Sequence, residues 1–393
     1  MTSERIPGDL APNPLARLLA EKRAVGRDVL DLTGTNPTDA GLGAPDPDEV
    51  LAALADRRAL RYEPDPRGLP VAREAAAAYL GGRAGFALSP DRVFLTASTS
   101  EAYAHLFRLL CEPGDEVLVP RPSYPLIEPL ARAEGARVHA YRLAWDGVWR
   151  LDPDSLEASL TDRTRAVVLV EPNNPTGSRL APEEFALVES LGHERGIALI
   201  VDEVFGDIVW PPREGTLASR LGERAVPTFV LGGISKPCGL PQLKLGWIAA
   251  SGPEARLAEI LPGLEWILDL FLSVGTPVQW ALPRLLALRH GYQAALRARL
   301  RESLAAIEEA AEAHPGSLVP QGGGAGLSAV LRVRHERGGP RPGEDLAEWA
   351  LRERDVHVHP AHFYDLPRDD LAVVSLLVPG PRMREALERI LAE

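Results

Sequence analysis

The amino-acid sequence predicts an α/β protein whose large domain is built on a mostly parallel sheet between helical layers. Short runs of β-forming apolar residues alternate with helical periodicity between about residue 90 and residue 250. Runs such as AVVLV and IALIV are apolar at every position, as a strand buried on both faces requires. The expected strands cover residues 92–96, 116–120, 165–170, 197–202, 228–233 and 245–250.

The connecting segments have the start and stop residues of crossover helices, for example Pro182 and Gly196 around PEEFALVESLGHERG. From residue 276 to residue 314 the pattern becomes long and amphipathic, with Pro283 and Gly291 as expected kinks or breaks. Short apolar runs and two helical stretches then indicate a smaller α+β domain. We expect an N-terminal segment that packs with the small domain, a large domain and a small C-terminal domain at 1–45, 46–275 and 276–393.

The composition narrows the class of function. The 393-residue chain has a formal net charge of -12, which argues against electrostatic binding of nucleic acid or of an anionic membrane. Its N-terminus has early charges and no continuous apolar core, so we expect neither a signal peptide nor a membrane span. Cys111 and Cys238 are too few for a disulfide framework. These features favour cytoplasmic chemistry on small molecules.

Small hydroxyl residues follow the first expected strand. Because ligands bind beyond the carboxyl ends of the strands in a doubly wound sheet, polar residues there are candidate site residues. Ser98, Thr99 and Ser100 open a helix whose first-turn N–H groups can hold a phosphate. The alternative is that Ser98 or Thr99 only caps this helix.

An amide and a carboxylate follow the next two central strands. The motif EPNNPTG presents Asn174, which can donate a hydrogen bond to a ligand oxygen or can bond its own backbone as a turn residue. Asp202 ends the run 197–202, and its burial is costly unless a cation or a donor lies nearby. Both residue types therefore suit a site for a polar aromatic ligand.

Two lysines follow the run 228–233 in the segment ISKPCGLPQLKLGW. Lys236 lies three residues after the expected strand, and Lys244 lies eight residues further along. Desolvation and neighbouring cations lower the pKa of a lysine, which makes its amine a nucleophile and a general base. A single lysine in a loop is usually a surface residue. The ordered series of motifs favours the functional interpretation here.

Taken in order, the motifs TASTSEA, PSYP, EPNNPTG, VDEVF and SKPCGLPQLKLGW resemble those of class I/II aminotransferases, which are fold-type I enzymes dependent on pyridoxal phosphate. The resemblance covers nearly the whole chain. It implies that Lys236 binds the cofactor as a Schiff base and moves the substrate proton, and that Asp202 pairs with the pyridinium nitrogen. Further implied cofactor contacts are Asn174 at the phenolic oxygen, Tyr124 on the ring face, and Ser98, Thr99, Ser100, Ser235 and Lys244 around the phosphate.

The resemblance also implies a homodimer. Tyr62 in RYEPDPRGLP matches a tyrosine that members of this family extend across the dimer interface to the phosphate in the partner's site.

Three positions near the cofactor depart from the family pattern. Lys244 stands where the family usually has arginine, so the charge is kept and the planar phosphate-binding fork is lost. Phe205 replaces a tyrosine that donates to the phenolic oxygen, and Gly233 replaces a serine. We therefore expect an atypical pocket.

The C-terminal region departs further. With the stretch LAVVSLLV aligned on Ser375, Val373 occupies the position of the arginine that binds the substrate carboxylate in the family. Arg332, Arg334 or a residue of the neighbouring subunit are the alternatives for that cation.

Three histidines lie close together in HVHPAH. His357, His359 and His362 could bind a metal, because alternate residues on a strand point the same way. No fourth ligand is evident in the sequence, so we expect no metal site. We expect these histidines to line the substrate side of the small domain or to face solvent.

The resemblance implies transfer of an amino group between an amino acid and a 2-oxo acid by a ping-pong mechanism. A C–S or other β-lyase on the same fold is the alternative, because cofactor motifs do not separate the two reactions. A non-catalytic sensor that binds pyridoxal phosphate is a less favoured alternative.

Overall fold

The computed structural model describes residues 3–8, 10–43, 46–210, 216–341 and 343–392. Its largest element is an eight-stranded sheet with the order β2-β9-β8-β7-β6-β3-β4-β5. The pairs among β8, β7, β6, β3 and β4 are parallel, and the pairs made by β9 and β5 are antiparallel. The strands are β2 Val93–Thr96, β3 Glu116–Arg121, β4 Arg137–Trp145, β5 Trp149–Leu151, β6 Thr164–Val170, β7 Ala198–Asp202, β8 Thr228–Gly233 and β9 Gly246–Ser251.

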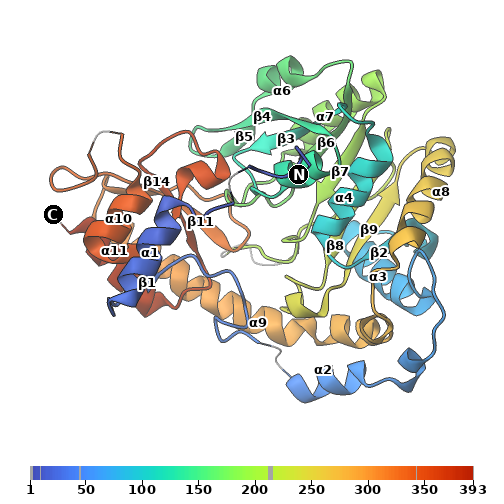
Figure 1. The fold of residues 1–393 in the computed structure, drawn as a ribbon, viewed down its shortest axis with the longest axis horizontal. Helices are drawn as coiled ribbons and strands as arrows, with labels where there is room; N and C mark the ends of the chain where they lie inside the picture. The colour runs from blue at the N-terminus through green and yellow to red at the C-terminus, as the bar shows by residue number, and fades with distance from the viewer. Residues whose placement is uncertain (1–2, 9, 44–45, 211–215, 342, 393) are drawn as a thin grey trace.

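Helices cover both faces of this sheet (Figure 1). Successive residues of β7 alternate between two cores: Ile200 packs with residues of α4 and α8, and Leu199 and Val201 pack with residues of α3, α7 and α9. The apolar runs in the sequence are therefore buried on both sides, as expected. The covering helices are α3 Pro70–Ala84, α4 Thr99–Leu110, α5 Ile127–Ala133, α7 Pro182–Arg195, α8 Glu254–Phe271 and α9 Thr276–Ala313.

A second, antiparallel sheet with the order β10-β11-β14-β13 lies beside the first. Its outer face packs on α10 and α11 in a core that includes Leu331, Trp349 and Leu387. The N-terminal segment joins this part, because β1 pairs in parallel with β12. The elements are β1 Leu30–Asp31, β10 Leu318–Pro320, β11 Ser328–Val333, β12 Val356–His357, β13 His359–Pro360, β14 Leu371–Ser375, α1 Pro14–Ala24, α10 Leu346–Arg354 and α11 Gly380–Leu391.

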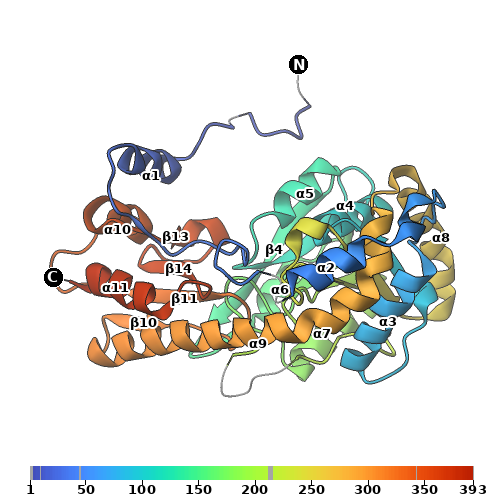
Figure 2. The same ribbon diagram turned by 90° about the horizontal axis from the view of Figure 1, so that it is seen from below.

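The helix α9 connects the two parts of the chain (Figure 2). It is one continuous helix of 38 residues, so the helix does not break at Pro283 or Gly291, where we expect kinks or breaks. Buried residues along its whole length, from Val278 to Ile307, pack against both cores. This packing outweighs the local cost of one missing backbone hydrogen bond and one flexible glycine.

Shorter helical elements complete the described chain: α2 Pro47–Leu54, α6 Pro153–Ser159, η1 Arg57–Leu60, η2 Pro90–Arg92, η3 Pro241–Leu243 and η4 Ala361–Tyr364. The six expected strands are confirmed to within a residue or two, and β4 and β5 are additions to them. Among the helices described, none has the length and apolarity needed to cross a bilayer.

The turn that follows β8 packs tightly on α9 through a glycine. Gly239 has φ +67, and a Cβ atom placed on it would lie 2.4–2.8 Å from ring atoms of Tyr292. Tyr292 is fully buried, so its ring has little room to move. This contact ties the segment that carries Lys236 to the long helix.

We expect Gly239→Ala to lower the free energy of unfolding by roughly 2–4 kcal/mol, because an overpacking clash adds to the cost of a left-handed alanine. Gly26→Ala is the matched control, with φ +73 and no atom within 4 Å of the added carbon. We expect it to cost about 1 kcal/mol. Denaturant titration of both variants measures the difference, and equal losses would contradict the packing argument.

Candidate active site

The central parallel strands end level with one another, which brings their following residues to one edge of the sheet. Asp202, the last residue of β7, is in register with Val170 of β6 and with Leu231 of β8. The Glu171 N–H donates to the Asp202 carbonyl at 2.8 Å. The segments that carry Asn174, Asp202 and Lys236 therefore leave the sheet side by side.

Asp202 is a buried carboxylate with two hydrogen-bond donors. Asp202 is only 6% exposed. The Val204 N–H donates to Oδ1 at 3.0 Å, and the Tyr103 hydroxyl donates to Oδ2 at 3.2 Å. Burial raises the pKa of Asp202 to about 6 in spite of these donors. No cationic side chain of the described residues offsets that burial. The carboxylate is thus left without a charge partner among the described residues.

Lys236 lies in the turn directly after β8 and is partly buried. Loss of hydration lowers the pKa of its amine, and no carboxylate of the described residues opposes this effect. The Nζ atom lies 5.5 Å from the ring centroid of Phe205, which follows Asp202 by three residues. Lys236 therefore stands beside the loop that leaves β7, with an amine easier to deprotonate than an exposed one.

The first turn of α4 follows β2 at the same edge. Ser98 is its N-cap and accepts a hydrogen bond from the Glu101 N–H at 3.1 Å, so the capping alternative applies to this hydroxyl. The Glu101 carboxylate in turn accepts from the Ala97 N–H at 2.6 Å and from the Ser273 hydroxyl at 2.7 Å. Thr99 and Ser100 are the first two helical residues, and both are partly exposed. Their side chains and N–H groups are available to an anion.

The two asparagines after β6 have different tasks. Asn173 holds the turn: its Oδ1 accepts from the Thr176 hydroxyl at 2.9 Å and its Nδ2 donates to the Pro122 carbonyl at 3.3 Å. Asn174 is half-buried, and its side chain makes no hydrogen bond within the described residues. The turn interpretation therefore fits Asn173, and the amide of Asn174 is left for a ligand.

Tyr124 lies after β3 and is 38% exposed. Burial, and to a smaller extent the negative charge of the nearby Asp202, raise the pKa of its hydroxyl. The neighbouring Ser123 N–H donates to the Tyr364 carbonyl at 3.1 Å. This hydrogen bond joins the loop to η4, which directly follows β13 of the small sheet. The loop that carries Tyr124 therefore contacts the part of the chain that holds the small sheet.

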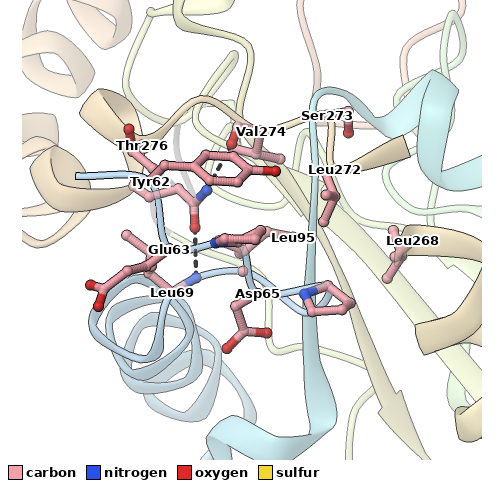
Figure 3. A pocket seen from close by; sticks show the side chains of 14 residues that line it. Tyr62, Glu63, Asp65, Leu69, Leu95, Leu268, Leu272, Ser273, Val274 and Thr276 are labelled. Carbon is pink, nitrogen blue, oxygen red and sulfur yellow. Dashed lines mark hydrogen bonds between the residues drawn. The ribbon is translucent and has the colours of Figure 1, made fainter. Parts of the chain in front are cut away.

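Three other expected cofactor contacts are less enclosed. Ser235 is partly buried next to Lys236, and Lys244 is exposed at the end of η3 with a left-handed φ of 52. Tyr62 is 82% exposed and lines a separate pocket near the end of α8, beside Val274 and Thr276 (Figure 3). None of the other candidate residues lines that pocket.

The two arginines that are alternatives for the substrate cation lie on β11 and directly after it, and both are near a carboxylate. Arg332 and Arg334 approach the Asp370 carboxylate at 3.1 and 3.9 Å. Val373 is fully buried on β14, in register with Val330 and His359.

Each of the three clustered histidines has its own partner. His357 contacts Asp31 at 3.2 Å, His359 contacts the Thr33 carbonyl at 3.3 Å, and His362 contacts Asp345 at 3.2 Å. Because a carbonyl only accepts, Nε2 of His359 carries the proton. The pKa of His359 is lowered by burial, so its ring is neutral near pH 7.

Two features of the site escaped sequence reasoning. Tyr103, on α4, contacts Asp202. The sequence contains a signal for this contact: Tyr103 shares the apolar face of the helix with Leu106 and Phe107, and a tyrosine hydroxyl that is buried there needs a hydrogen-bond partner. Behind Asp202, the buried Glu203 pairs with Arg83 at 3.0 Å. That pair joins residues 120 positions apart, for which the sequence carries no local signal.

Solved structures resemble this fold over almost its whole length. An aminotransferase from Escherichia coli superposes with a TM-score of 0.84 at 22% identity and covers 99% of this chain and 96% of its own. The alanine aminotransferase from Pyrococcus furiosus gives 0.84 at 24% identity and covers 99% and 98%. These likenesses confirm the fold-type I prediction.

Curated relatives match shorter segments. Nicotianamine aminotransferase 1 of Oryza sativa subsp. japonica is 34% identical over 223 residues, which are 56% of this chain and 44% of that protein. S-alkyl-thiohydroximate lyase SUR1 of Arabidopsis thaliana is 30% identical over 241 residues, 61% of this chain and 52% of the other. This chain therefore spans about half the length of these plant relatives.

Glutamate-pyruvate aminotransferase AlaA of Escherichia coli (strain K12) is 28% identical over 270 residues, 68% of this chain and 65% of that protein. The sequence model described as "Aminotransferase class I and II" matches residues 27–370, which include every strand-end motif described above. With that match across most of its length, this chain belongs to the class I and II aminotransferase family.

Proposed function

We propose that this chain is an aminotransferase that uses pyridoxal phosphate to move an amino group between an amino acid and a 2-oxo acid in a ping-pong cycle. The observation that carries the proposal is the pairing of a buried carboxylate, Asp202, with a desolvated amine, Lys236, after neighbouring strands. Each lacks a partner of opposite charge among the described residues. A ligand with a cationic ring and an electrophilic carbonyl satisfies both.

The donor set fits this cofactor. When bound, pyridoxal phosphate supplies a carbonyl that condenses with amines and a protonated ring that accepts an electron pair. Asp202 would hold the ring nitrogen in its protonated form, and the unpartnered amide of Asn174 would donate to the phenolic oxygen. Tyr124 would cover the ring face. The first turn of α4 would bind the phosphate, through the residues Ser98, Thr99 and Ser100, with Ser235 and Lys244 nearby.

Lys236 has two tasks in this proposal, cofactor attachment and proton transfer. Its lowered pKa favours the neutral amine, which can attack a carbonyl and can accept a proton. With an amino substrate in the site, the neutral Lys236 amine would be the group that accepts, holds and releases the proton of the substrate α-carbon. The Phe205 ring lies 5.5 Å from Nζ and supplies an apolar neighbour to this amine.

Relatives support transamination and supply one alternative. AlaA is named for glutamate and pyruvate, and the rice and barley proteins are named for nicotianamine. SUR1 is named a lyase, which favours C–S or other β-lyase chemistry as the second candidate.

We also propose a homodimer in which Tyr62 reaches the partner's site. Apolar residues that are exposed at the end of α8 support it. This apolar patch consists of Trp266, Leu270 and Phe271 in the last two turns of α8 and of Leu272, which caps that helix. The pocket in Figure 3 joins Tyr62 to Leu272 in this patch. Large exposed apolar patches usually mark protein interfaces.

The proposed domain division is 1–45, 46–275 and 276–393, supported by the pairing of β1 with β12 and by the start of α9 at Thr276. We also propose a cytoplasmic location, supported by two cysteines that form no disulfide.

The function is tested by half-reactions. An amino-acid donor is expected to convert the bound cofactor spectrum to the pyridoxamine form, and a 2-oxo acid is expected to reverse it. Lys236→Ala should slow both steps at least roughly 100-fold and should abolish attachment of the cofactor to the chain by borohydride, because it removes the base and the nucleophile. Lys22→Ala is the matched control, because Lys22 pairs with Asp355 in the small part of the chain. Release of ammonia and pyruvate from a β-substituted amino acid, with no 2-oxo acid dependence, would instead support the lyase.

The buried Asp202 carboxylate predicts a pH-dependent stability of the cofactor-free protein. Because its pKa is raised to about 6 from an ordinary value near 4, the folded chain binds more protons than the unfolded chain between these pH values. Stability should therefore fall as the pH rises through this window. Asp202→Asn should raise the free energy of unfolding of the cofactor-free protein at pH 8 by roughly 1–3 kcal/mol, while weakening cofactor binding.

Denaturant titrations at pH 5 and pH 8 measure this difference. Parallel pH profiles for the wild type and Asp202→Asn would show that the carboxylate carries no such cost.

The dimer is tested by placing a charge in the patch. Trp266 is 64% exposed on one chain, so Trp266→Glu should leave the monomer folded and should weaken association at least tenfold, because a dimer would bury the carboxylate unpaired. Val25→Glu is the control, at a residue that is 76% exposed outside the patch. Sedimentation velocity measures both, and a Trp266→Glu protein that remains dimeric would reject this interface.

A further inference from the structure

We infer that Tyr103 is a positioning residue that sets the orientation of the Asp202 carboxylate toward the ring nitrogen of pyridoxal phosphate. The inference rests on the proposed cofactor and adds to it a residue of α4 outside the motifs that identify the family. Its direct observation is the hydrogen bond from the Tyr103 hydroxyl to Oδ2 of Asp202 at 3.2 Å.

Tyr103 is itself held rigidly. It is 2% exposed, and its ring lies 5.7 Å from that of Phe107 at an interplanar angle of 34°. The core around it includes Leu106 and Ile200, from the helix and the sheet below. The Asp202 carboxylate is the one hydrogen-bond partner of the hydroxyl within the described residues. The hydroxyl therefore has a fixed position and a single acceptor.

The direction of this hydrogen bond is also fixed. Burial and the nearby negative charge of Asp202 raise the pKa of Tyr103 well above its ordinary value, so the hydroxyl keeps its proton and donates. The other titratable groups that act on the carboxylate are Glu203, which opposes its ionisation, and Tyr124, which is neutral. Among the described side chains, only that of Tyr103 donates to this carboxylate.

Two donors from different elements determine the plane of the carboxylate. The Val204 N–H binds Oδ1 from the loop after β7, and Tyr103 binds Oδ2 from α4. A carboxylate held at both oxygens cannot rotate freely about its last bond, and each oxygen keeps a lone pair for a further donor. A ring N–H then meets a preoriented acceptor, which lowers the cost of ordering on binding.

The same helix serves both ends of the cofactor. Ser98 caps α4 and Thr99 begins it, at the proposed phosphate site, and Tyr103 lies little more than one turn further along. Because α4 is packed on the sheet through this face, the distance between the first-turn N–H groups and the Tyr103 hydroxyl is set by helix geometry. The distance between the proposed phosphate site and the acceptor for the ring nitrogen is thereby fixed.

The test compares two tyrosine variants and two ligands. Tyr103→Phe removes the hydroxyl that binds Asp202, and Tyr141→Phe is the matched control, because Tyr141 is equally buried and donates to the Val168 carbonyl at 2.8 Å. Cofactor-free protein is titrated with pyridoxal phosphate and with its analogue in which carbon replaces the ring nitrogen. Binding is followed by absorbance, so the readout does not depend on turnover.

We expect Tyr103→Phe to weaken binding of pyridoxal phosphate by roughly tenfold, as for loss of one hydrogen bond to a charged group. Tyr141→Phe should change it less than about twofold. Neither variant should change the affinity for the carbon analogue, which has no ring N–H to present to Asp202. In an Asp202→Asn background, adding Tyr103→Phe should have no further effect.

Equal weakening of both ligands by Tyr103→Phe would overturn the inference, because it would indicate only a structural role. An unchanged affinity for pyridoxal phosphate would overturn it as well. If the wild type binds no pyridoxal phosphate, both the proposed function and the inference fail. If the wild type binds it and Tyr103→Phe does not show the expected loss, only the inference fails. Tyr103→Leu also lacks the hydroxyl and carries the same comparison if Tyr103→Phe does not fold.

Discussion

Burial of the Asp202 carboxylate, with no cationic partner in the described part of the chain, is the constraint on which the rest of the site depends. An ionised group in this position is unfavourable for the folded chain, and two hydrogen bonds offset only part of that cost. The neighbouring pair of Glu203 and Arg83 shows the usual solution, a buried charge with a partner at 3.0 Å. The charge of the Glu203 carboxylate is thus compensated by Arg83, and the charge of the adjacent Asp202 carboxylate is not compensated by any described side chain.

The sheet makes this imbalance useful because it fixes what lies next to Asp202. Parallel strands in register end at one edge, so the segments after β6, β7 and β8 emerge together. Asn174 and Lys236 emerge there with polar groups that the described chain does not satisfy. Groups left unsatisfied at one edge favour a ligand that satisfies them jointly over ligands that meet only one.

Local sequence signals were enough for the six expected strands, for the strand-end residues and for the family. They failed where partners distant in sequence decide the outcome. The sequence indicates kinks or breaks at Pro283 and Gly291, and it gives no local sign that the packing of α9 against two cores keeps the helix continuous. The division of tasks between Asn173 and Asn174 depends on Pro122, 51 residues away, and the contact of Tyr103 with Asp202 spans 99 residues. Tertiary contacts of this kind override local preference.

The uninterrupted helix α9 also has a mechanical consequence. Its 38 residues span about 57 Å, with one half against the large sheet and the other against the small one. Pro283, where the hydrogen-bond ladder lacks one rung, lies near its start, and a bend of about 5° there would displace the far end, about 45 Å away, by roughly 4 Å. The helix has the geometry of a lever arm, because a small change of angle at Pro283 would become a translation of the small sheet, which carries Val373.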